Sequence, residues 1–345
     1  MLTSKKILLF APKYFGYEKD IVAKLSEMGA NVDYYDERPG NGFFIKSVIR
    51  LSRNTFNFFI KMYYSKILKE TAKQKYDYVF VVNLEALSPS ILSKIKLQQP
   101  NAKFILYMWD SIQNKKNAIS TLPYFDCTLT FDSDDAKKIN NLHLRPLFFS
   151  DIYDANTWGD LNNKEDIDFL FIGTMHSDRY SILQIIKDFV LSHEMSIYLY
   201  MYFQFNILFW YKIIRDKKFR VASKREFNFT ELKRSQVIDY LKRAKIIIDI
   251  EHPEQAGLTS RTLEMLGAKK KIITTNIHIK EYDFYDEQNV LIIDRDSPQI
   301  PLGFLNSNYK DVSEDIRFKY SIRGWLTEIF KTADDSLIGY TQKTD

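Results

Sequence analysis

Cysteine is almost absent from this sequence, since Cys127 is the only one in 345 residues. A single thiol excludes an intrachain disulfide framework and any zinc site built on several cysteines, and it fits a reducing compartment. The five histidines are scattered without a His-x-x-x-His pair, which argues against a catalytic zinc site of the zincin type. We therefore expect neither a metal centre nor a disulfide scaffold.

Long apolar runs are also missing. A helix that spans a membrane needs ~20 mostly apolar residues, whereas the nearest run, 205–214, is shorter and includes Asn206 and Lys212. The apolar stretch 7–10 is too short for the core of a signal peptide, so we predict a first strand there. These absences lead us to expect a cytoplasmic protein.

Glycine-rich nucleotide motifs are absent as well. The chain has 11 glycines and contains neither Gly-x-Gly-x-x-Gly nor Gly-x-x-x-x-Gly-Lys-Ser/Thr, which argues against nicotinamide dehydrogenases and P-loop enzymes. There is also no Gly-x-Ser-x-Gly elbow of the kind that positions a catalytic serine in hydrolases. Any nucleotide site must therefore be built in another way.

The composition that remains is that of a folded protein. Hydrophobic residues make up 45% and charged residues 27%, which does not suit a disordered chain. At 345 residues the chain is long enough for two domains, each with its own core. The net charge of +5 is modest, and no recognised nucleic-acid module accompanies it. We expect no nucleic-acid partner.

Short runs rich in β-branched and aromatic residues alternate with helical stretches. The first series falls at 6–11, 31–35, 78–82, 103–108, 127–131 and 144–149. The second series falls at 167–172, 196–201, 244–250, 271–275 and 289–293. Such alternation is typical of α/β domains with a mostly parallel sheet and helices on both faces.

This pattern predicts an α/β protein with two Rossmann-like, doubly wound domains. The first spans 1–150 and the second 167–311, with the polar segment 151–166 as linker. The stretch 312–345 supplies an amphipathic helix, which is expected to pack at the domain junction or return to the first domain, and a tail.

The segment 251–275 joins two predicted strands through a loop of small and polar residues and a helix. Gly257 lets the backbone approach a ligand closely. Thr259 and Ser260 supply hydroxyls and a helix N-cap, and the free N–H groups at the start of the helix favour an anion. This layout is suited to a phosphate group.

Two charged residues extend this segment. Arg261 and Glu264 are three positions apart, so both project from about one face of the helix. A guanidinium suits a phosphate, and a carboxylate suits a ribose diol. The alternative interpretation is an ordinary capped helix in an α/β domain.

A second polar loop follows the strand predicted at 167–172. Gly173 opens the turn, and Arg179 falls near the start of the next helix. Ligands in open α/β sheets bind beyond the carboxyl ends of the strands, so Arg179 can lie on a diphosphate opposite the Gly257 loop. The alternative is a surface arginine held by Asp178.

Two acids of the first domain also follow strand ends. Glu85 comes after the strand at 78–82, and Asp110 after the strand at 103–108. Either carboxylate can act as general base toward an acceptor hydroxyl. The alternatives are a solvated loop acid for Glu85 and a helix N-cap for Asp110.

Residues 43–75 carry eight Lys or Arg against one acid, with apolar positions at helical spacing. This predicts a basic amphipathic helix or a pair of them. Such a helix can cover the sheet and leave a solvated cationic back. It can also rest on anionic lipid headgroups, and the residues that would then meet the membrane are Lys46, Arg50, Arg53 and Lys61.

With these residues in view, the chain resembles the bacterial GT-B glycosyltransferases found in capsule, O-antigen (lipopolysaccharide) and exopolysaccharide biosynthesis. The resemblance rests on the stretch from Gly173 to Arg179 and on Gly-Leu-Thr-Ser-Arg-Thr-Leu-Glu-Met-Leu-Gly at 257–267. It implies two Rossmann-like domains that face a cleft. The second domain would hold a nucleotide-sugar donor as substrate, and the first a glycan or polyprenyl-linked acceptor, with no metal or other cofactor.

The resemblance also implies roles for single residues. Glu264 would bind the ribose, and the diphosphate would lie at Thr259, Ser260, Arg261 and Arg179. The remaining donor-binding positions are Gly173, Gln255, Gly257 and Leu258. Many retaining members have two glutamates eight positions apart, but the position eight residues before Glu264 is Ala256. The stereochemical outcome therefore stays open, and Asp110 or Glu85 would be the base of an inverting reaction.

The expected function is transfer of a sugar from a nucleotide donor to a surface glycan, in the cytoplasm or peripherally on the inner face of the cell membrane. Two alternatives remain at this point. One is a non-catalytic sugar-nucleotide binding or scaffold protein of the same fold, and the other is a sugar-nucleotide epimerase.

Overall fold

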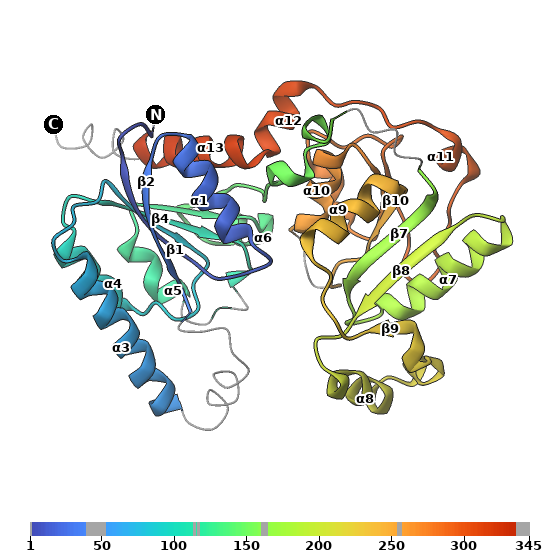
Figure 1. Ribbon diagram of the computed structural model, residues 1–345, viewed down its shortest axis with the longest axis horizontal. Helices are drawn as coiled ribbons and strands as arrows, with labels where there is room; N and C mark the ends of the chain where they lie inside the picture. The colour runs from blue at the N-terminus through green and yellow to red at the C-terminus, as the bar shows by residue number, and fades with distance from the viewer. Residues whose placement is uncertain are drawn as a thin grey trace. The chain divides into compact units, whose positions relative to one another are not determined.

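The computed structural model describes residues 2–38, 53–112, 115, 118–159, 165–253 and 257–335. The chain divides into two compact units, one formed by residues 1–147 with 322–345 and the other by residues 148–321. Each unit contains a six-stranded sheet with helices packed on it (Figure 1). All the strand pairs are parallel, which confirms the predicted α/β class with two Rossmann-like domains.

The first unit has the strand order β2-β1-β3-β4-β5-β6. Its strands are β1 (Lys6–Ala11), β2 (Asn31–Asp36), β3 (Tyr78–Val82), β4 (Lys103–Met108), β5 (Cys127–Thr130) and β6 (Leu142–Leu144). Its helices are α1 (Tyr17–Glu27), α3 (Arg53–Thr71), α4 (Pro89–Gln98), α5 (Ala118–Thr121), α6 (Ser133–Lys138) and α13 (Ile322–Asp335), with a 3-10 turn η2 (Leu122–Tyr124). The strand predicted at 144–149 was wrong, because the pairing ends at Leu144 and Pro146 cannot donate to a ladder.

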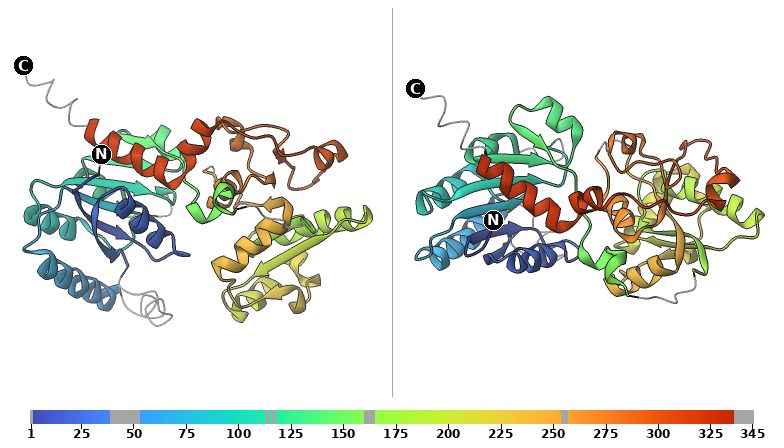
Figure 2. Two further views of the ribbon diagram at one scale, coloured as in Figure 1. Left: turned by 45° about the horizontal axis from the view of Figure 1, so that its top comes forward. Right: turned by 90° about the horizontal axis from the view of Figure 1, so that it is seen from above.

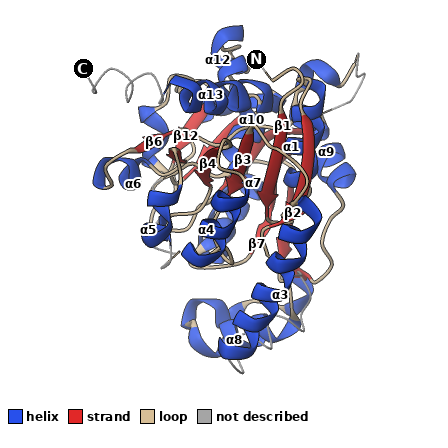
Figure 3. Cartoon of the chain, turned by 90° about the vertical axis from the view of Figure 1, so that its left-hand side faces the viewer, coloured by secondary structure: helices blue, strands red, loops and turns tan. Residues whose placement is uncertain are grey.

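Helices cover both faces of this first sheet, so its strands are apolar at nearly every position. Leu8 faces a core shared with α3 and α4. On the opposite face, the ring of Tyr78 lies 4.9 Å from Phe330, and the ring of Phe80 lies 6.0 Å from Trp325, both centroid to centroid. The C-terminal helix α13 therefore packs along the first sheet (Figure 2). Figure 3, coloured by secondary structure, shows the strands in red with the helices around them in blue.

The second unit has the strand order β12-β11-β10-β7-β8-β9. Its strands are β7 (Ile167–Thr174), β8 (Ile197–Tyr202), β9 (Phe227–Asn228), β10 (Ala244–Asp249), β11 (Lys271–Thr274) and β12 (Val290–Ile292). Its helices are α7 (Arg179–Ser192), α8 (Asn206–Arg215), α9 (Arg234–Arg243), α10 (Ser260–Ala268), α11 (Leu302–Asn306) and α12 (Glu314–Tyr320). The short strand β9 was not predicted, because two residues give no periodic signal.

Short 3-10 turns connect several of these elements in the second unit. They are η3 (Asp151–Tyr153), η4 (Ala155–Thr157), η5 (Lys217–Val221), η6 (Lys224–Glu226) and η7 (Ile277–Glu281). Thus part of the polar segment predicted as linker is ordered as η3 and η4, and η3 packs against α10. No helix within the described residues is both long and apolar enough to cross a membrane.

The C-terminal amphipathic stretch forms two helices that meet at Ser321. The backbone of Ser321 is extended, with φ −70° and ψ 157°. Helix α12 therefore ends at Tyr320, and α13 begins as a separate helix at Ile322. The backbone N–H of Phe149 donates to the carbonyl of Tyr320 at 2.9 Å. The two points at which the chain passes between the units, after Leu147 and after Ser321, are therefore held side by side.

Candidate functional site

The order of the strands in the second sheet indicates where a ligand would bind. The chain starts at β7, moves outward through β8 and β9, and then returns to build β10, β11 and β12 on the other side. In open α/β sheets, ligands lie beyond the carboxyl ends of the strands at such a reversal. The reversal here falls between β7 and β10, and the two polar loops predicted from the sequence follow these two strands.

Arg179, the first residue of α7, ties these two loops together. Its Nη1 donates to the carbonyl of Thr174 at 2.6 Å, and its Nε donates to the carbonyl of Ile250. The guanidinium carbon lies 5.9 Å from the centre of the Phe171 ring. A Cβ at Gly173 would come within 2.9 Å of that ring and 3.4 Å of Nη1. A side chain at 173 would therefore have to displace the Phe171 ring, which packs beside the guanidinium of Arg179.

Arg295 lies in the loop after β12 and was not predicted as a site residue. Its Nη1 donates to both carboxylate oxygens of Asp178, at 2.9 and 3.0 Å. Its Nη2 donates to Oε1 of Glu251 at 2.6 Å and to the carbonyl of Glu251 at 2.9 Å. Asp178 therefore binds Arg295 in the second unit and is not the cap of Arg179 that was considered as an alternative. The partners of Arg295 are 117 and 44 positions away in the chain, so the local sequence gives no signal for the role of Arg295.

Glu251, two residues after the end of β10, is buried, and both of its carboxylate oxygens are bonded. Its Oε2 accepts a hydrogen bond from the hydroxyl of Thr275 at 2.8 Å, opposite the bond from Arg295. Burial raises the pKa of Glu251, while the hydrogen bonds from Thr275 and Arg295 act to lower it. Glu251 thus joins the loops that follow β10, β11 and β12.

Three arginines act on one another at this edge of the sheet. The pKa of Arg179 is lowered, and burial is the largest cause. The carboxylates of Asp249 and Glu251 raise that pKa, and the charges of Arg295 and Arg261 lower it further. Guanidinium groups suit phosphate oxygens. Arg295 is already bonded to Asp178 and Glu251, so Arg179 and Arg261 are the arginines of this edge that were predicted to meet a diphosphate.

The start of α10 is fixed by Asp249, the last residue of β10. Thr259 is the N-cap, as predicted, and its Oγ1 accepts from the N–H of Thr262 at 3.3 Å. The hydroxyls of Thr259 and Thr262 both donate to Oδ2 of Asp249, each at 2.7 Å. Asp249 is 5% exposed, so its charge is satisfied by these hydroxyls. Asp249 was missed because its role depends on a helix cap, Thr259, that lies ten residues later.

Arg261 and Glu264 lie on one face of α10, as their spacing predicted. Nη1 of Arg261 is 2.7 Å from Oε2 of Glu264, and Glu264 is 3% exposed. Leu258 is buried, and Ser260, the first residue of α10, is partly buried. Gln255, also predicted to bind the donor, lies outside the described residues.

The other end of α10 is held by close packing and by a buried cation. A Cβ at Gly267 would lie 2.7 Å from the Phe149 ring and 2.9 Å from the carbonyl of Tyr153. Arg317 donates to the carbonyls of Leu266 and Gly267 at 3.1 and 2.7 Å. A cation at a helix C-terminus satisfies carbonyls that the helix leaves unpaired. The orientation of α10, and with it the place of Arg261, is therefore fixed at both ends.

The first unit brings the two predicted bases together around one lysine. Nζ of Lys115 lies 2.8 Å from Oε1 of Glu85 and 3.2 Å from Oδ2 of Asp110. Burial acts to lower the pKa of Lys115, but the hydrogen bonds and charges of Glu85 and Asp110 raise it above its usual value. Lys115 was not predicted. It keeps a positive charge between the two carboxylates.

Glu37, after β2, shapes the loop that carries Glu85. Its Oε1 accepts hydrogen bonds from the N–H groups of Glu85, Ala86 and Leu87 at 2.9, 2.6 and 2.8 Å. The side chain is fully buried, and burial raises the pKa of Glu37 to about 8 despite these donors. Asn83, which precedes the loop, has a positive φ of 62°. This arrangement turns the Glu85 side chain to Lys115.

Aromatic side chains gather at the carboxyl end of the first sheet. The ring centroid of Tyr14 lies 4.6 Å from Phe15, 6.5 Å from Tyr17 and 6.0 Å from Trp109. Tyr14 and Phe15 are each 50% exposed, although both are large and apolar. The reversal of this sheet lies between β1 and β3, and residues 12–16 follow β1, so the aromatic group stands at a ligand position.

The predicted basic helix is present in part. Helix α3 begins at Arg53, and its described face exposes Lys61 together with Phe58, Phe59 and Met62. Lys46, Arg50 and the side chain of Arg53, which were predicted to meet a membrane, lie outside the described residues. Within the described residues, no group of three or more His, Cys, Asp or Glu side chains could hold a metal ion.

Comparisons with known proteins give a structural answer only. No family model matches the chain, and no curated protein matches it in sequence. Among solved structures, it is similar to an α-glucosyltransferase solved with UDP and a DNA that contains an A:G mismatch. The identity is 11%, the TM-score is 0.62, and the match covers 96% of this chain and 100% of that chain.

Two further solved structures have the same architecture. An α,α-trehalose-phosphate synthase (UDP-forming) from Burkholderia xenovorans, solved with glucose-6-phosphate, matches with 10% identity and a TM-score of 0.63 over 96% of this chain and 100% of that chain. A UDP-GlcNAc 2-epimerase from Methanocaldococcus jannaschii matches with 11% identity and a TM-score of 0.53 over 94% and 99%. At such low identity the likeness is one of fold, and the predicted GT-B fold of two Rossmann-like domains is shown.

Proposed function

We propose that the chain is a glycosyltransferase that moves a sugar from a nucleotide-sugar donor to an acceptor hydroxyl. The observation that carries the proposal is the cluster at the reversal of the second sheet. There Arg179 and Arg261 lie near the N-terminus of α10, with Glu264 on the same helix face as Arg261. Fixed cations and a helix N-terminus suit a departing nucleoside diphosphate. Similar folds were solved with UDP or described as UDP-forming.

In this proposal the residues around the start of α10, together with Arg179, have separate roles. Arg179 and Arg261 bind the diphosphate, Ser260 and the loop 257–259 place N–H groups and a hydroxyl on it, and Glu264 accepts hydrogen bonds from the ribose. The charge that develops on the leaving diphosphate is then stabilised by arginines and backbone N–H groups. The reaction would need neither a metal nor another cofactor, and the nucleotide sugar is its substrate.

The acceptor would be held by the first unit. The ring of Tyr14 is half-exposed, and Phe15 stands edge to face against it. An exposed aromatic face of this kind packs against the C–H face of a sugar ring. Glu85 or Asp110 would take the proton from the acceptor hydroxyl. Lys115, bonded to both, would orient the pair.

The acceptor class that fits best is a glycan or polyprenyl-linked sugar of a surface polysaccharide, such as a capsule or lipopolysaccharide. The exposed face of α3 supports this, because Lys61 accompanies Phe58, Phe59 and Met62 there. Basic and apolar side chains together suit the surface of an anionic membrane, on which a lipid-linked acceptor would be found. The protein would then work peripherally on the inner face of the cell membrane.

An epimerase acting on a sugar nucleotide is the second candidate. It is favoured by the similarity of fold to the UDP-GlcNAc 2-epimerase. A binding or scaffold protein of this fold is the third, and it would keep the donor site without catalysis. The three differ in what they make from the donor: a transferase needs an acceptor, an epimerase converts the donor alone, and a binder makes no product.

The deciding experiment has two stages. A thermal-shift screen of nucleotides and sugar nucleotides comes first, because a ligand of the folded state raises the unfolding temperature. Each stabilising sugar nucleotide is then incubated with and without glycan acceptors, and products are separated. A transferred sugar supports the proposal, conversion without acceptor supports the epimerase, and binding without product supports the binder. If no nucleotide stabilises the protein, the donor site is refuted.

A further inference from the structure

Helix α8 in the second unit turns an apolar face to solvent. Ile207, Trp210, Tyr211 and Ile214 follow one another at intervals of three, one and three residues, so they form one stripe along the helix. Their exposed fractions are 72, 53, 54 and 72%. Single exposed apolar residues are ordinary, but a contiguous stripe of large ones marks an interaction surface.

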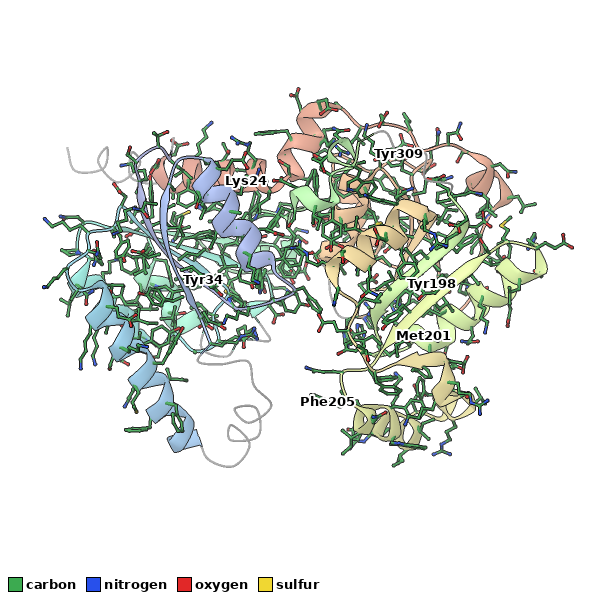
Figure 4. The ribbon with its side chains drawn as sticks, viewed as in Figure 1. Lys24, Tyr34, Tyr198, Met201, Phe205 and Tyr309 are labelled. Atoms are coloured by element: carbon green, nitrogen blue, oxygen red, sulfur yellow. The ribbon has the colours of Figure 1, made fainter. Side chains whose placement is uncertain are left out.

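The opposite face of α8 is anchored in the core, which fixes the direction of the stripe. Phe209 is 2% exposed, and its ring centroid lies 5.8 Å from Phe219 and 5.4 Å from Phe227. Ile213, one turn further on, packs against the same core cluster. The helix lies at the β9 edge of the second sheet, and Phe205 marks its beginning in Figure 4. Phe209 and Ile213 therefore fix the orientation of α8, and this orientation leaves the apolar stripe exposed.

The segment around the stripe is strongly basic. Residues 206–225 carry seven Lys or Arg and one acid, Asp216. Among the side chains that the structure describes there, the exposed basic ones are Arg215, Arg220, Lys224 and Arg225. The guanidinium carbon of Arg215 lies 4.9 Å from the centre of the exposed Tyr211 ring. Positive charge thus borders the apolar stripe.

We propose that the surface formed by α8, η5 and η6 docks on an anionic membrane. The stripe of Ile207, Trp210, Tyr211 and Ile214 would enter the headgroup region, and the neighbouring basic side chains would meet anionic lipid headgroups. Trp and Tyr suit this depth because each has an apolar ring and one polar group. A protein partner of this surface would need an acidic rim around an apolar centre, whereas an anionic bilayer offers both without further specificity.

Membrane docking at this surface does not depend on which reaction the donor site performs. The surface is nevertheless connected to the candidate donor site through α8. Lys212, on the inner side of α8, donates to the carbonyl of Ser177, in the loop between β7 and α7. Its Nζ lies 5.3 Å from the centre of the Phe219 ring, and burial lowers the pKa of Lys212. A membrane bound at α8 would therefore hold the unit that carries Arg179 at the bilayer.

The test uses the whole chain and sedimentation with two kinds of vesicle, phosphatidylcholine alone and phosphatidylcholine mixed with phosphatidylglycerol. We expect the wild type to sediment with the mixed vesicles. Ile207→Asp with Ile214→Asp should weaken that binding by at least about tenfold. Arg215→Ala with Arg220→Ala should also weaken it, by about tenfold. The matched control is Leu97→Asp with Leu191→Asp, which places charges at exposed leucines outside the surface and should bind as the wild type does.

Circular dichroism melting of each variant shows that folding is retained, and light scattering reports the oligomeric state. Quenching of Trp210 by brominated lipid, measured against Trp210→Phe, locates the stripe in the bilayer. The proposal is overturned if the wild type ignores the mixed vesicles, or if the aspartate pair on α8 binds as well as its control. It is also overturned if the wild type is a dimer that the α8 aspartates dissociate, because the stripe would then be an interface between two copies.

Discussion

The guanidinium of Arg295 lies 2.6 Å from the carboxylate of Glu251, joining the loop after β12 to the loop after β10. Glu251 is 4% exposed, and its other oxygen is bonded by the Thr275 hydroxyl. The second guanidinium nitrogen holds Asp178, next to Arg179. Arg295 therefore holds together the loops that follow β7, β10 and β12 at the candidate donor site.

Arg295→Ala should destabilise the protein by roughly 1 to 3 kcal/mol, because it leaves the buried carboxylate of Glu251 without its cation. Urea unfolding followed by circular dichroism measures the change. Arg295→Lys is the matched variant, and it should recover part of the loss because one ammonium can bond Glu251 but cannot span to Asp178. Equal stability of the alanine variant and the wild type would contradict the role assigned to Arg295.

Gly267→Ala should destabilise the protein by about 1 to 3 kcal/mol through overpacking. The new Cβ would lie 2.7 Å from the Phe149 ring and 2.9 Å from the Tyr153 carbonyl. Gly303→Ala is the control, because a Cβ there meets nothing within 4 Å and should leave stability unchanged or raise it slightly. Thermal unfolding of the two variants side by side would decide, and a loss of the same size in both would show that packing at α10 is not the cause.

Glu37 should make stability fall as the pH rises. Burial raises the pKa of Glu37 to about 8 in the folded state, whereas the unfolded chain loses this proton near pH ~4.3. Between these values the folded state binds the additional proton, so stability decreases by up to about 1.4 kcal/mol per pH unit across the window and is unaffected by Glu37 below it.

Glu37→Gln should remove that dependence, because an amide resembles the protonated carboxyl and its oxygen can still accept from Glu85, Ala86 and Leu87. The measurement is the midpoint of urea unfolding from pH 5 to pH 8, relative to the wild type at each pH. Parallel pH profiles of the two proteins would show that Glu37 is already ionised in the folded state.

Glu264→Ala should weaken nucleotide binding by roughly 1 to 3 kcal/mol through the loss of hydrogen bonds to the ribose. Isothermal titration calorimetry with the nucleotide selected in the thermal-shift screen measures this. Glu231→Ala, at an exposed position of the same unit, is the control and should bind as the wild type does. Unchanged affinity of the Glu264 variant would remove Glu264 from the proposed donor site.

Tyr14→Ala should raise the KM for the acceptor by about 5- to 30-fold, since a stacked ring contributes on the order of 1 to 2 kcal/mol. Slow hydrolysis of the donor without acceptor should not change, because the aromatic group belongs to the first unit. Phe318→Ala is the control, as Phe318 is also 50% exposed but lies on α12. A change in donor hydrolysis with an unchanged acceptor KM would contradict the acceptor role.

The fold could be predicted largely from the sequence because its strands are buried on both faces. Buried parallel strands appear as short, continuous apolar runs, and β3 and β4 have the predicted bounds. The prediction failed where the signal is weak. Strand β6 ends at Leu144, before a proline, and β9 has two residues. Helical periodicity continues across Ser321, although the backbone there is extended and separates α12 from α13.

The candidate site was predictable only in the part that is local in sequence. Thr259 caps α10, and Arg261 reaches Glu264 within one turn, so spacing alone brings these residues together. The partners of Arg295 and the bridge from Lys115 to Glu85 depend on loops that are distant in the chain. No pattern of neighbouring residues signals such contacts.

The sequence by itself determined the class of the protein: two α/β domains, polar loops after the strands, and no glycine-rich phosphate motif. It did so because hydrophobic periodicity and helix capping act over a few residues. The tertiary structure alone decided that Asp178 binds Arg295, that Glu85 and Asp110 share Lys115, and that α8 exposes its apolar stripe. Burial and charge pairing arise between segments that meet only when the sheets form, so they cannot be read from local pattern.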